Sequence, residues 1–414
     1  MSPDRQSHRQ HGRRPGDAPG GYAAGLAADL YGFAERLTEA EQAVLEELHT
    51  VLQAEVRPRL LEAWDAARLP EAITTPLVRL RLMDPPVLTR AGEPLRQLMR
   101  GFISFEIARC DLSMATWFNA QASLFRTLCR IGADPENAAE LDQRIRAYEL
   151  TGVFALTEPG HGSDVARGLT TTATRTPDGA GWVLEGAKRW IGGADRADVL
   201  ATFAREAEDG RIRCFLVPRE APGVGVRVIG HKASLRIMQN AEIRYEGVEV
   251  SDAARLPGID GFADVSRCLR QMRSDVAWMA VGAMAGAYEA ALRQVGAREQ
   301  FGRPLAGFQL IQEKFARMLG QLTGSLALVV RLTEQQQDGI YREESSALAK
   351  MQTALALREV VALAREVCGG DGITLETDVA RFHADAEAVY SYEGTHEINA
   401  LLVGRAVTGH SAFV

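Results

Sequence analysis

The hexapeptide Tyr392-Glu-Gly-Thr-His-Glu397 places a carboxylate in a break between two apolar helical stretches. The glycine after Glu393 gives access to the carboxylate, and the tyrosine before it excludes water. Burial raises the pKa of a carboxyl group, and a base that removes a proton from a weakly acidic C–H bond needs such a raised value. The sequence therefore offers Glu393 as a general base, with an exposed loop glutamate as the alternative interpretation.

Two segments near the middle of the chain have residues suited to a phosphorylated or flat aromatic ligand. In Leu156-Thr-Glu-Pro-Gly-His-Gly-Ser-Asp164, small residues let backbone N–H groups converge on an anion, and the Thr157 and Ser163 hydroxyls add donors. In Lys188-Arg-Trp-Ile-Gly-Gly193, the tryptophan beside glycines can cover a flat ring. Taken alone, the first is more often a surface turn and the second a core tryptophan.

Two segments near helix ends can also approach a ligand. An arginine in Arg298-Glu-Gln-Phe-Gly-Arg-Pro-Leu305 can bind a pyrophosphate with two hydrogen bonds, although an ordinary helix–helix loop has the same composition. Cys368-Gly-Gly-Asp-Gly372 contains more glycine than one helix C-cap requires, which favours a close backbone approach to a ligand. No metal site is expected, because His161 lacks a second ligand at metal-binding spacing and the five cysteines are scattered.

The elements that must position these residues change type twice along the chain. Helical periodicity begins near Thr38, where Thr38 and Glu41 form a capping-box pattern. Short β-branched segments separated by glycine turns follow from Leu150, and helical periodicity returns after Gly261. No βαβ alternation occurs, so a dinucleotide-binding Rossmann domain is not expected. The sequence predicts a mainly α chain with a central β domain, built as a small antiparallel barrel.

The domain division follows from these changes of pattern. We expect a disordered tail over residues 1–21, an N-terminal helical domain over 38–149, a middle β domain over 150–261 and a C-terminal helical bundle over 262–414. The bundle helices have core positions that can also support self-association.

Charge and hydropathy exclude two classes of partner. The formal net charge is -7 without a clustered basic face, which argues against nucleic acid. No apolar run is long enough to cross a bilayer and no signal-like stretch opens the chain, so a cytoplasmic protein is expected. Only four of the 47 basic residues are lysines, which is typical of a GC-rich bacterial genome.

Together, the order and spacing of these motifs resemble the acyl-CoA dehydrogenase family, from about Thr38 to the C-terminus. The resemblance rests on Leu156-Thr-Glu-Pro with Gly162-Ser-Asp, on Arg298-x-Gln-Phe-Gly, on Cys368-Gly-Gly-Asp-Gly and on Tyr392-Glu-Gly-Thr. The C-terminal segment from Tyr392 looks closest to the glutaryl-CoA dehydrogenase branch, and the segment from Gly160 also looks like short-chain acyl-CoA oxidases. The resemblance implies an N-terminal helical domain, a middle β barrel, a C-terminal helical bundle and a homotetramer, or a homodimer.

The resemblance also implies FAD as the cofactor. Thr157 is expected near the isoalloxazine ring and Trp190 on it, while Arg298, Gln309 and Gly369-Gly370 are expected to hold the adenine dinucleotide end across a subunit interface. The full set of implied cofactor-binding residues is Phe154, Leu156, Thr157, Gly162, Ser163, Trp190, Ile191, Gly192, Arg298, Phe301, Gln309, Glu366, Gly369, Gly370, Thr395 and Glu397.

The implied activity is that of an oxidoreductase acting on CH–CH groups. Glu393 would remove the α-proton of an acyl thioester while flavin N5 takes the β-hydride, which gives the 2,3-enoyl thioester. Hydrogen bonds from the Gly394 N–H and the flavin ribityl hydroxyl would stabilise the developing enolate. The residues expected to face the substrate are Ser163, Arg273, Gly394 and Asn119.

One rival position for the base can be checked in the sequence. Some branches of the family carry the base immediately before the residue that matches Arg273. That residue is Met272 here, and its thioether cannot accept a proton. Glu393 is left as the candidate.

The chain departs from the family pattern at several positions. Gly192 replaces the usual threonine beside the flavin, and Glu366 and Glu397 stand where other members often have an amide or an aspartate. Ala115 aligns with the carboxylate-binding arginine of the glutaryl branch, and Asn119 aligns with its serine. A distal carboxylate would be buried unpaired beside Ala115, so glutaryl-CoA decarboxylation is not expected.

Several functions remain open at this point. The first is a dehydrogenase that takes a CoA or acyl-carrier-protein thioester and passes electrons to an electron-transfer flavoprotein. The second is an oxidase that uses O₂ directly. A flavin monooxygenase and a non-enzymatic FAD-binding subunit are also compatible with the fold, but neither needs a base such as Glu393.

Overall fold

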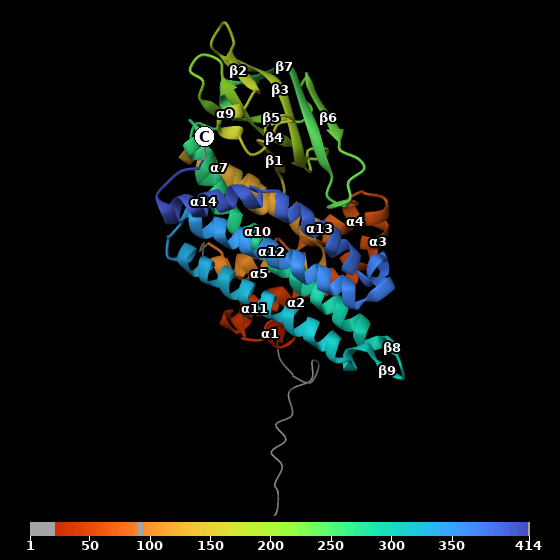
Figure 1. Ribbon diagram of the computed structural model, residues 1–414. Coiled ribbons are helices and arrows are strands. Elements are labelled where there is room, and N and C mark those ends of the chain that lie inside the picture. The colour runs from red at the N-terminus through yellow and green to blue at the C-terminus, as the bar shows by residue number, and fades with distance from the viewer. Residues whose placement is uncertain (1–20, 90–93, 413–414) are drawn as a thin grey trace, which may run out of the picture.

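The computed structural model describes residues 21–89 and 94–412, and it places a β region at one end of a large helical body (Figure 1). The predicted tail, residues 1–21, lies outside the described residues except for Gly21, at which α1 (Gly21–Ala24) begins. Tyr22 and Leu26 are buried in the main hydrophobic core. The helical packing therefore starts before Thr38. Within the described residues, no helix combines the length and the apolar character needed to cross a bilayer.

The N-terminal region is a set of short helices. They are α2 (Glu39–Val51), α3 (Leu60–Asp65), α4 (Glu71–Arg79), α5 (Gln97–Cys110), α6 (Leu112–Asn119), α7 (Arg126–Gly132) and α8 (Pro135–Arg146), with the 3-10 or π turns η1 (Phe33–Arg36), η2 (Leu52–Val56), η3 (Arg57–Arg59) and η4 (Ala120–Phe125). The predicted capping box is confirmed, because Thr38 Oγ1 accepts from the Glu41 N–H at 3.3 Å and Glu41 Oε2 accepts from the Thr38 N–H at 2.8 Å.

The middle region is a single curled sheet. Its strands are β1 (Gly152–Ala155), β2 (Thr172–Arg175), β3 (Gly181–Gly192), β4 (Val199–Glu206), β5 (Ile212–Pro218), β6 (Val224–Val228) and β7 (Asn240–Ser251), with α9 (Val165–Gly168) after β1 and η5 (Asp252–Ala254) after β7. The sheet is mixed rather than wholly antiparallel, because β1 and β2 both pair with β4 in parallel. Alternating apolar residues from its inner face, among them Trp182, Phe215 and Tyr245, form a second core.

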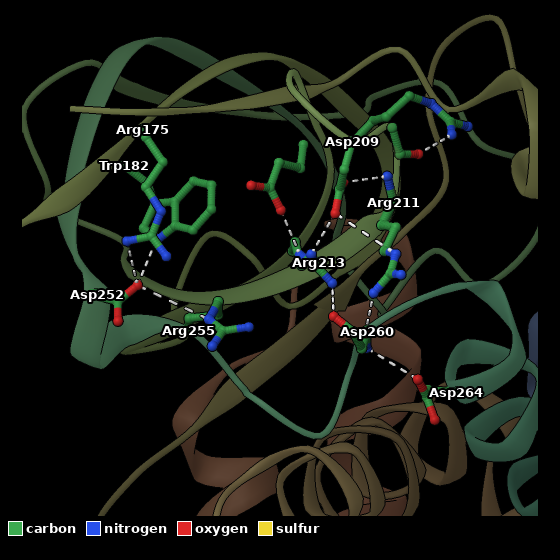
Figure 2. A network of polar contacts seen from close by, with 12 residues as sticks. Arg175, Trp182, Asp209, Arg211, Arg213, Asp252, Arg255, Asp260 and Asp264 are labelled. Carbon is green, nitrogen blue, oxygen red and sulfur yellow. Dashed lines mark hydrogen bonds and ion pairs between the residues drawn. The ribbon is translucent and has the colours of Figure 1, made fainter. Parts of the chain in front are cut away.

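A network of charges fixes the junction between this sheet and the C-terminal helices (Figure 2). Arg211 donates to Asp260 at 2.7 Å, and Arg213 on β5 pairs with both Asp260 and Asp209. The Asp260 N–H donates to the Asp264 carboxylate at 3.0 Å, just inside the next helix. The start of α10 is thereby held against β5.

The C-terminal region is a bundle of long helices. Its elements are α10 (Phe262–Ala297), α11 (Gln309–Gln337), α12 (Glu343–Val367), α13 (Val379–Ser391) and α14 (His396–Thr408), with β8 (Glu299–Gln300), β9 (Arg303–Pro304), η6 (Leu305–Gly307), η7 (Gly369–Ile373) and η8 (Leu375–Thr377) between them. The helix of 36 residues, α10, lies between α5 and α12. A methyl group at Gly282 would lie 2.2 Å from the Phe105 carbonyl oxygen, so glycine permits the close contact of α10 with α5. The domain boundaries at residues 150 and 261 stay predictions.

Candidate active site

Glu393 lies in a two-helix junction, where α13 ends and α14 begins. The Tyr392 N–H closes α13 on the Ala388 carbonyl at 2.9 Å, and the Thr395 hydroxyl caps α14 by accepting from the Ile398 N–H at 3.2 Å. Glu393 and Gly394 have φ angles of 56° and 84°, both in the left-handed region. Only glycine adopts such a conformation without steric cost, so the glutamate occupies a strained position beside the glycine.

The Glu393 carboxyl group has an environment suited to a base. Within the described residues its Oε2 atom has no hydrogen-bond partner, although it is shielded from solvent. Burial raises the pKa of Glu393 to about 7, with the charges of Lys350 and Arg273 opposing the rise and Asp275 adding to it. The group therefore holds or releases a proton near neutral pH, as proton transfer from carbon requires.

Arg273 is held in α10 by a carboxylate of another helix. Its Nη1 lies 3.5 Å from Oε1 of Glu343, which also pairs with Arg405 at 2.7 Å. Arg273 is buried, and its Nε has no partner among the described residues. Burial lowers its pKa, opposed by Glu343 and Glu393. Met272, the residue at the rival base position, is fully buried and apolar.

The segment from Leu156 to Ser163 is fixed by a buried ion pair. Glu158 accepts from the backbone N–H groups of Thr170 at 2.7 Å and Thr171 at 2.8 Å, and from the Lys188 ammonium at 2.8 Å. Burial alone would raise the pKa of Glu158, but Lys188 and these hydrogen bonds bring it down to about 2. Burial lowers the pKa of Lys188 to about 8, with Glu158 opposing. The pair fixes the start of the loop against β3.

Trp190 projects from β3 next to that loop. The β3–β7 register is irregular between Lys188 and Ile191, and Trp190 has a φ of 64°. Its side chain is 52% exposed, and the preceding Arg189 N–H donates to the Thr157 carbonyl at 2.8 Å. The exposed Trp190 indole therefore projects from a strained backbone position that directly follows the hydrogen bond to Thr157. A methyl group at Gly160 or Gly162 would meet nothing within 4 Å.

The remaining predicted cofactor residues lie elsewhere in the chain. The β8–β9 hairpin is at the end of the bundle opposite the sheet (Figure 1). Arg298 pairs there with Asp371 of η7 at 3.1 Å, which brings it near Gly369 and Gly370. Phe301 in the hairpin is 93% exposed. One chain therefore does not bring these residues together with Trp190.

Asn119 lines a small cavity of about 20 Å³ between the N-terminal helices and α10. Phe118 and Asp275 share this cavity, and Asp275 accepts a short hydrogen bond from Ser123. The charge of Asp275 raises the pKa of Glu393, so this side of the cavity lies within electrostatic reach of the Glu393 carboxyl group. That Asn119 and Arg273 face the substrate stays a prediction.

Comparison with known proteins decides the family. Residues 153–248 match the middle domain of acyl-CoA dehydrogenases, and residues 260–408 match their C-terminal domain. Cyclohex-1-ene-1-carbonyl-CoA dehydrogenase of Geobacter metallireducens is 30% identical over 382 residues, which cover 90% of this chain and 99% of that protein. The chain belongs to the acyl-CoA dehydrogenase family. Benzylmalonyl-CoA dehydrogenase of Aromatoleum aromaticum is 27% identical over 90% of this chain and 99% of its own length.

Solved structures confirm the acyl-CoA dehydrogenase fold. Glutaryl-CoA dehydrogenase from Mycobacterium smegmatis superposes with a TM-score of 0.85 at 32% identity, covering 92% of this chain and 98% of that chain. A glutaryl-CoA dehydrogenase structure from the same bacterium contains FADH2. The chain is an oxidoreductase of the class that acts on CH–CH groups, and FAD is the cofactor.

The residues present fit a flavin in this acyl-CoA dehydrogenase. The exposed Trp190 indole offers a flat apolar face, and the open glycines of the Leu156–Ser163 loop leave room for a bulky group beside it. Leu156 and Ile191 are buried, whereas Gly162 and Ser163 are exposed. A methyl group at Gly192 would lie 2.5 Å from the Met238 Cε, so a threonine there would require Met238 to move.

The other implied cofactor residues have local roles in the single chain. Phe154 packs on Phe203 with ring centres 4.7 Å apart. Glu366 pairs with Lys314 at 3.1 Å, and Gln309 is the first residue of α11. Thr395 caps α14, and Glu397 stands exposed in its first turn. Their contacts with FAD stay predictions.

Four residues of the site were missed by sequence reasoning. Glu158 and Lys188 lie inside motifs in which other residues were expected to bind the cofactor. Asp275 and Lys350 lie in helices that contain no motif at those positions. A lysine within the apolar stretch Ala347-Leu-Ala-Lys350-Met was the available signal for Lys350, because a lysine is rarely buried without a partner.

Proposed function

We propose that this chain oxidises an acyl-CoA thioester to the 2,3-enoyl thioester, with Glu393 as the base that removes the α-proton. The observation that carries the proposal is the Oε2 atom of Glu393, which is shielded from solvent and has no hydrogen-bond partner among the described residues, in a carboxyl group whose pKa burial raises to about 7. Fully buried Met272 leaves no proton acceptor at the rival position. The relatives named above carry benzylmalonyl-CoA, cyclohexene-carbonyl-CoA or glutaryl-CoA in their names, which favours CoA over a carrier protein.

The chain's own residues perform the proton transfer and stabilise the negative charge. Glu393 takes the proton from the α-carbon, and the Gly394 N–H donates to the thioester oxygen in this proposal as negative charge develops. The positive charges of Lys350 and Arg273 oppose the effect of burial on the pKa of Glu393, so they favour the ionised carboxylate that acts as the base. FAD, when bound beside Trp190, supplies the acceptor for the β-hydride. The apolar surroundings of Tyr392 keep water away from the reacting atoms.

The pH dependence of the reaction follows from the raised pKa of Glu393. Below pH 7 the group is protonated and cannot act as a base, so kcat/KM should rise with pH through a limb centred near pH 7. Steady-state rates with an artificial electron acceptor across this range would measure the limb. A limb centred at the pKa of a solvated glutamate would contradict the buried base.

The structure favours an acyl group without a distal carboxylate. Ala115 is fully surrounded in α6, at the position where the glutaryl branch has its arginine. Of the two arginines that line the Asn119 cavity, Arg126 pairs with Asp142 at 2.7 Å and Arg100 lies 3.8 Å from Asp275. Each cation therefore already has an anionic neighbour. We expect oxidation without decarboxylation.

Anaerobic titration with a panel of acyl-CoA thioesters tests the proposed function. The panel would include straight-chain, cyclic and dicarboxylic acyl groups, with matched acyl-carrier-protein thioesters. We expect loss of the oxidised flavin absorbance with a neutral acyl-CoA and none with glutaryl-CoA. If no thioester bleaches the flavin, the proposal fails.

The electron acceptor is part of the same proposal. An electron-transfer flavoprotein is the proposed acceptor. A homotetramer, or a homodimer, is also proposed, because Arg298, Gly369 and Gly370 can contact a cofactor bound at Trp190 only from another chain. One observation favours an oxidase instead: Gly192 brings no hydroxyl to the flavin side of β3. Stoichiometric peroxide without a mediator would identify the oxidase.

A further inference from the structure

Lys350 is a buried cation whose contacts lie on both sides of the proposed base. It is on α12, and its side chain is fully buried. Its ammonium donates to the Gly394 carbonyl at 2.7 Å and to the Tyr390 carbonyl at 3.2 Å. Glu393 lies between these two residues in the chain. One side chain thus connects the end of α13 to the start of α14.

The backbone that Lys350 contacts needs external support. Glu393 has a left-handed φ of 56°, which is strained for a residue with a Cβ atom, whereas Gly394 adopts its φ of 84° without steric cost. Besides Lys350, the Asn399 amide holds the junction by donating to the Gly394 carbonyl at 2.8 Å and to the Thr395 carbonyl at 3.0 Å. The Asn399 contacts lie on the α14 side only. Lys350 alone also reaches the α13 side.

The buried face of α12 around Lys350 is made of small or apolar, uncharged residues. They are Ser346, Ala347, Thr353, Ala354 and Leu357, and a buried ammonium is costly unless it is paired and hydrogen-bonded. The charged groups around it are Glu393 and Glu397, which attract it, and Arg273, which repels it. Burial lowers the pKa of Lys350 to about 8, with Glu393 as the main opposing charge. The ammonium is therefore placed against the Glu393 loop.

We propose that Lys350 is a positioning residue, which clamps the backbone on both sides of Glu393 and supplies the cation that faces its carboxylate. The proposal rests on Glu393 being the base. The groups that face Glu393 are Lys350 from α12, Arg273 and Asp275 from α10, and Tyr392 beside it. Among them, Lys350 alone is also hydrogen-bonded to the loop backbone. Lys350 therefore affects both the position of the Glu393 carboxylate and its pKa.

A purely structural interpretation makes a different prediction. If Lys350 only capped the last turn of α13, its loss would lower stability and leave the pH dependence of catalysis unchanged. If it acts on Glu393, its loss leaves the burial of the carboxylate opposed mainly by Arg273. The rising limb of kcat/KM then moves to higher pH by about one unit or more.

Lys350→Met tests the proposal in the FAD-loaded protein. The change keeps the length of the side chain and removes the charge and both hydrogen bonds. We expect the kcat/KM limb to move upward, and the rate above the new limb to stay about tenfold to a hundredfold below wild type, because the carboxylate is less well placed. Hydrogen exchange followed by mass spectrometry should show faster exchange in residues 390–399, independently of activity.

Thr353→Val is the matched control. Thr353 is buried on the same helix, and its hydroxyl bonds only to carbonyls of α12 itself. This variant should keep the wild-type limb and the wild-type exchange in residues 390–399. Lys350→Arg, which retains a cation and N–H donors, should return the limb toward the wild-type position. Lys350→Gln replaces the Met variant if that does not fold, since its shorter, uncharged side chain still offers N–H donors.

The outcomes separate this proposal from the one on which it rests. An unchanged limb and unchanged exchange in a folded Lys350→Met or Lys350→Gln variant would overturn the role of Lys350 while Glu393 remained the base. Near wild-type turnover in Glu393→Gln would overturn the base itself. A shifted limb with faster exchange in residues 390–399 supports the clamp.

Discussion

Glu393→Gln should abolish turnover while the protein keeps its FAD. The amide occupies nearly the same volume but cannot accept the α-proton, and loss of a general base typically costs about 10²–10⁴-fold or more in rate. Reductive half-reaction rates under anaerobic conditions, with the flavin absorbance as a measure of cofactor content, would report both quantities. Near wild-type bleaching rates would remove Glu393 from the mechanism.

Glu387→Gln provides the control for this prediction. Glu387 lies on α13 close to Glu393 in sequence, but it is exposed and pairs with Arg358 at 2.9 Å. The same chemical change there should leave turnover unchanged.

The free energy of unfolding of Glu393→Gln also has a predicted direction of change. Because burial raises the pKa of Glu393 from its ordinary value to about 7, the charged form is disfavoured in the folded protein, and the variant should be the more stable protein above pH 7.

Lys188→Met should destabilise the protein by about 3–5 kcal/mol, because it leaves the Glu158 carboxylate buried without a cation. Both side chains of this pair are almost completely buried. Since Glu158 has a pKa of about 2 in the folded protein, the pair stabilises the fold above the ordinary glutamate pKa, and this contribution is lost as the pH falls toward 2. Denaturant-induced unfolding at neutral pH, with FAD content measured in parallel, would test the effect.

Two comparisons make the Lys188 prediction specific. Lys314→Met removes a surface ion pair with Glu366, and an exposed pair of this kind contributes only about 0–1 kcal/mol. Glu158→Gln combined with Lys188→Met removes both charges and should recover much of the lost stability. If Lys188→Met were no more harmful than Lys314→Met, the ion pair would not be what fixes the Leu156–Ser163 loop.

The parts of the structure that depend on local sequence could be predicted. The Thr38–Glu41 capping box and the break at Glu393 each depend on residues a few positions apart. The order of helices, strands and helices followed from periodicity for the same reason. The parallel pairing of β1 with β4 could not be predicted, because it joins strands separated by about 45 residues and depends on how the sheet curls.

The electrostatics of the site were less accessible from the sequence. Lys350 reaches the Glu393 loop from a helix that ends 26 residues before Glu393, and periodicity does not reveal which helix faces which loop. The left-handed backbone of Trp190 was also unexpected, since it arises from the irregular β3–β7 register rather than from glycine. The family resemblance implied that Trp190 packs on the flavin ring. The backbone strain at Trp190 and the exposure of its indole, however, are properties of the folded chain.

The burial of Lys188 and Lys350 has a consequence for the acylation of lysine side chains by acyl thioesters. The four lysines of the chain are these two, Lys232, which is half-buried and donates to three oxygens, and Lys314, whose side chain is 21% exposed and paired with Glu366. Acyl thioesters modify free amines spontaneously, whereas guanidinium groups stay protonated and unreactive at physiological pH. None of the four lysine side chains is therefore freely exposed to an acyl thioester, and the surface ammonium of Lys314 is paired with Glu366.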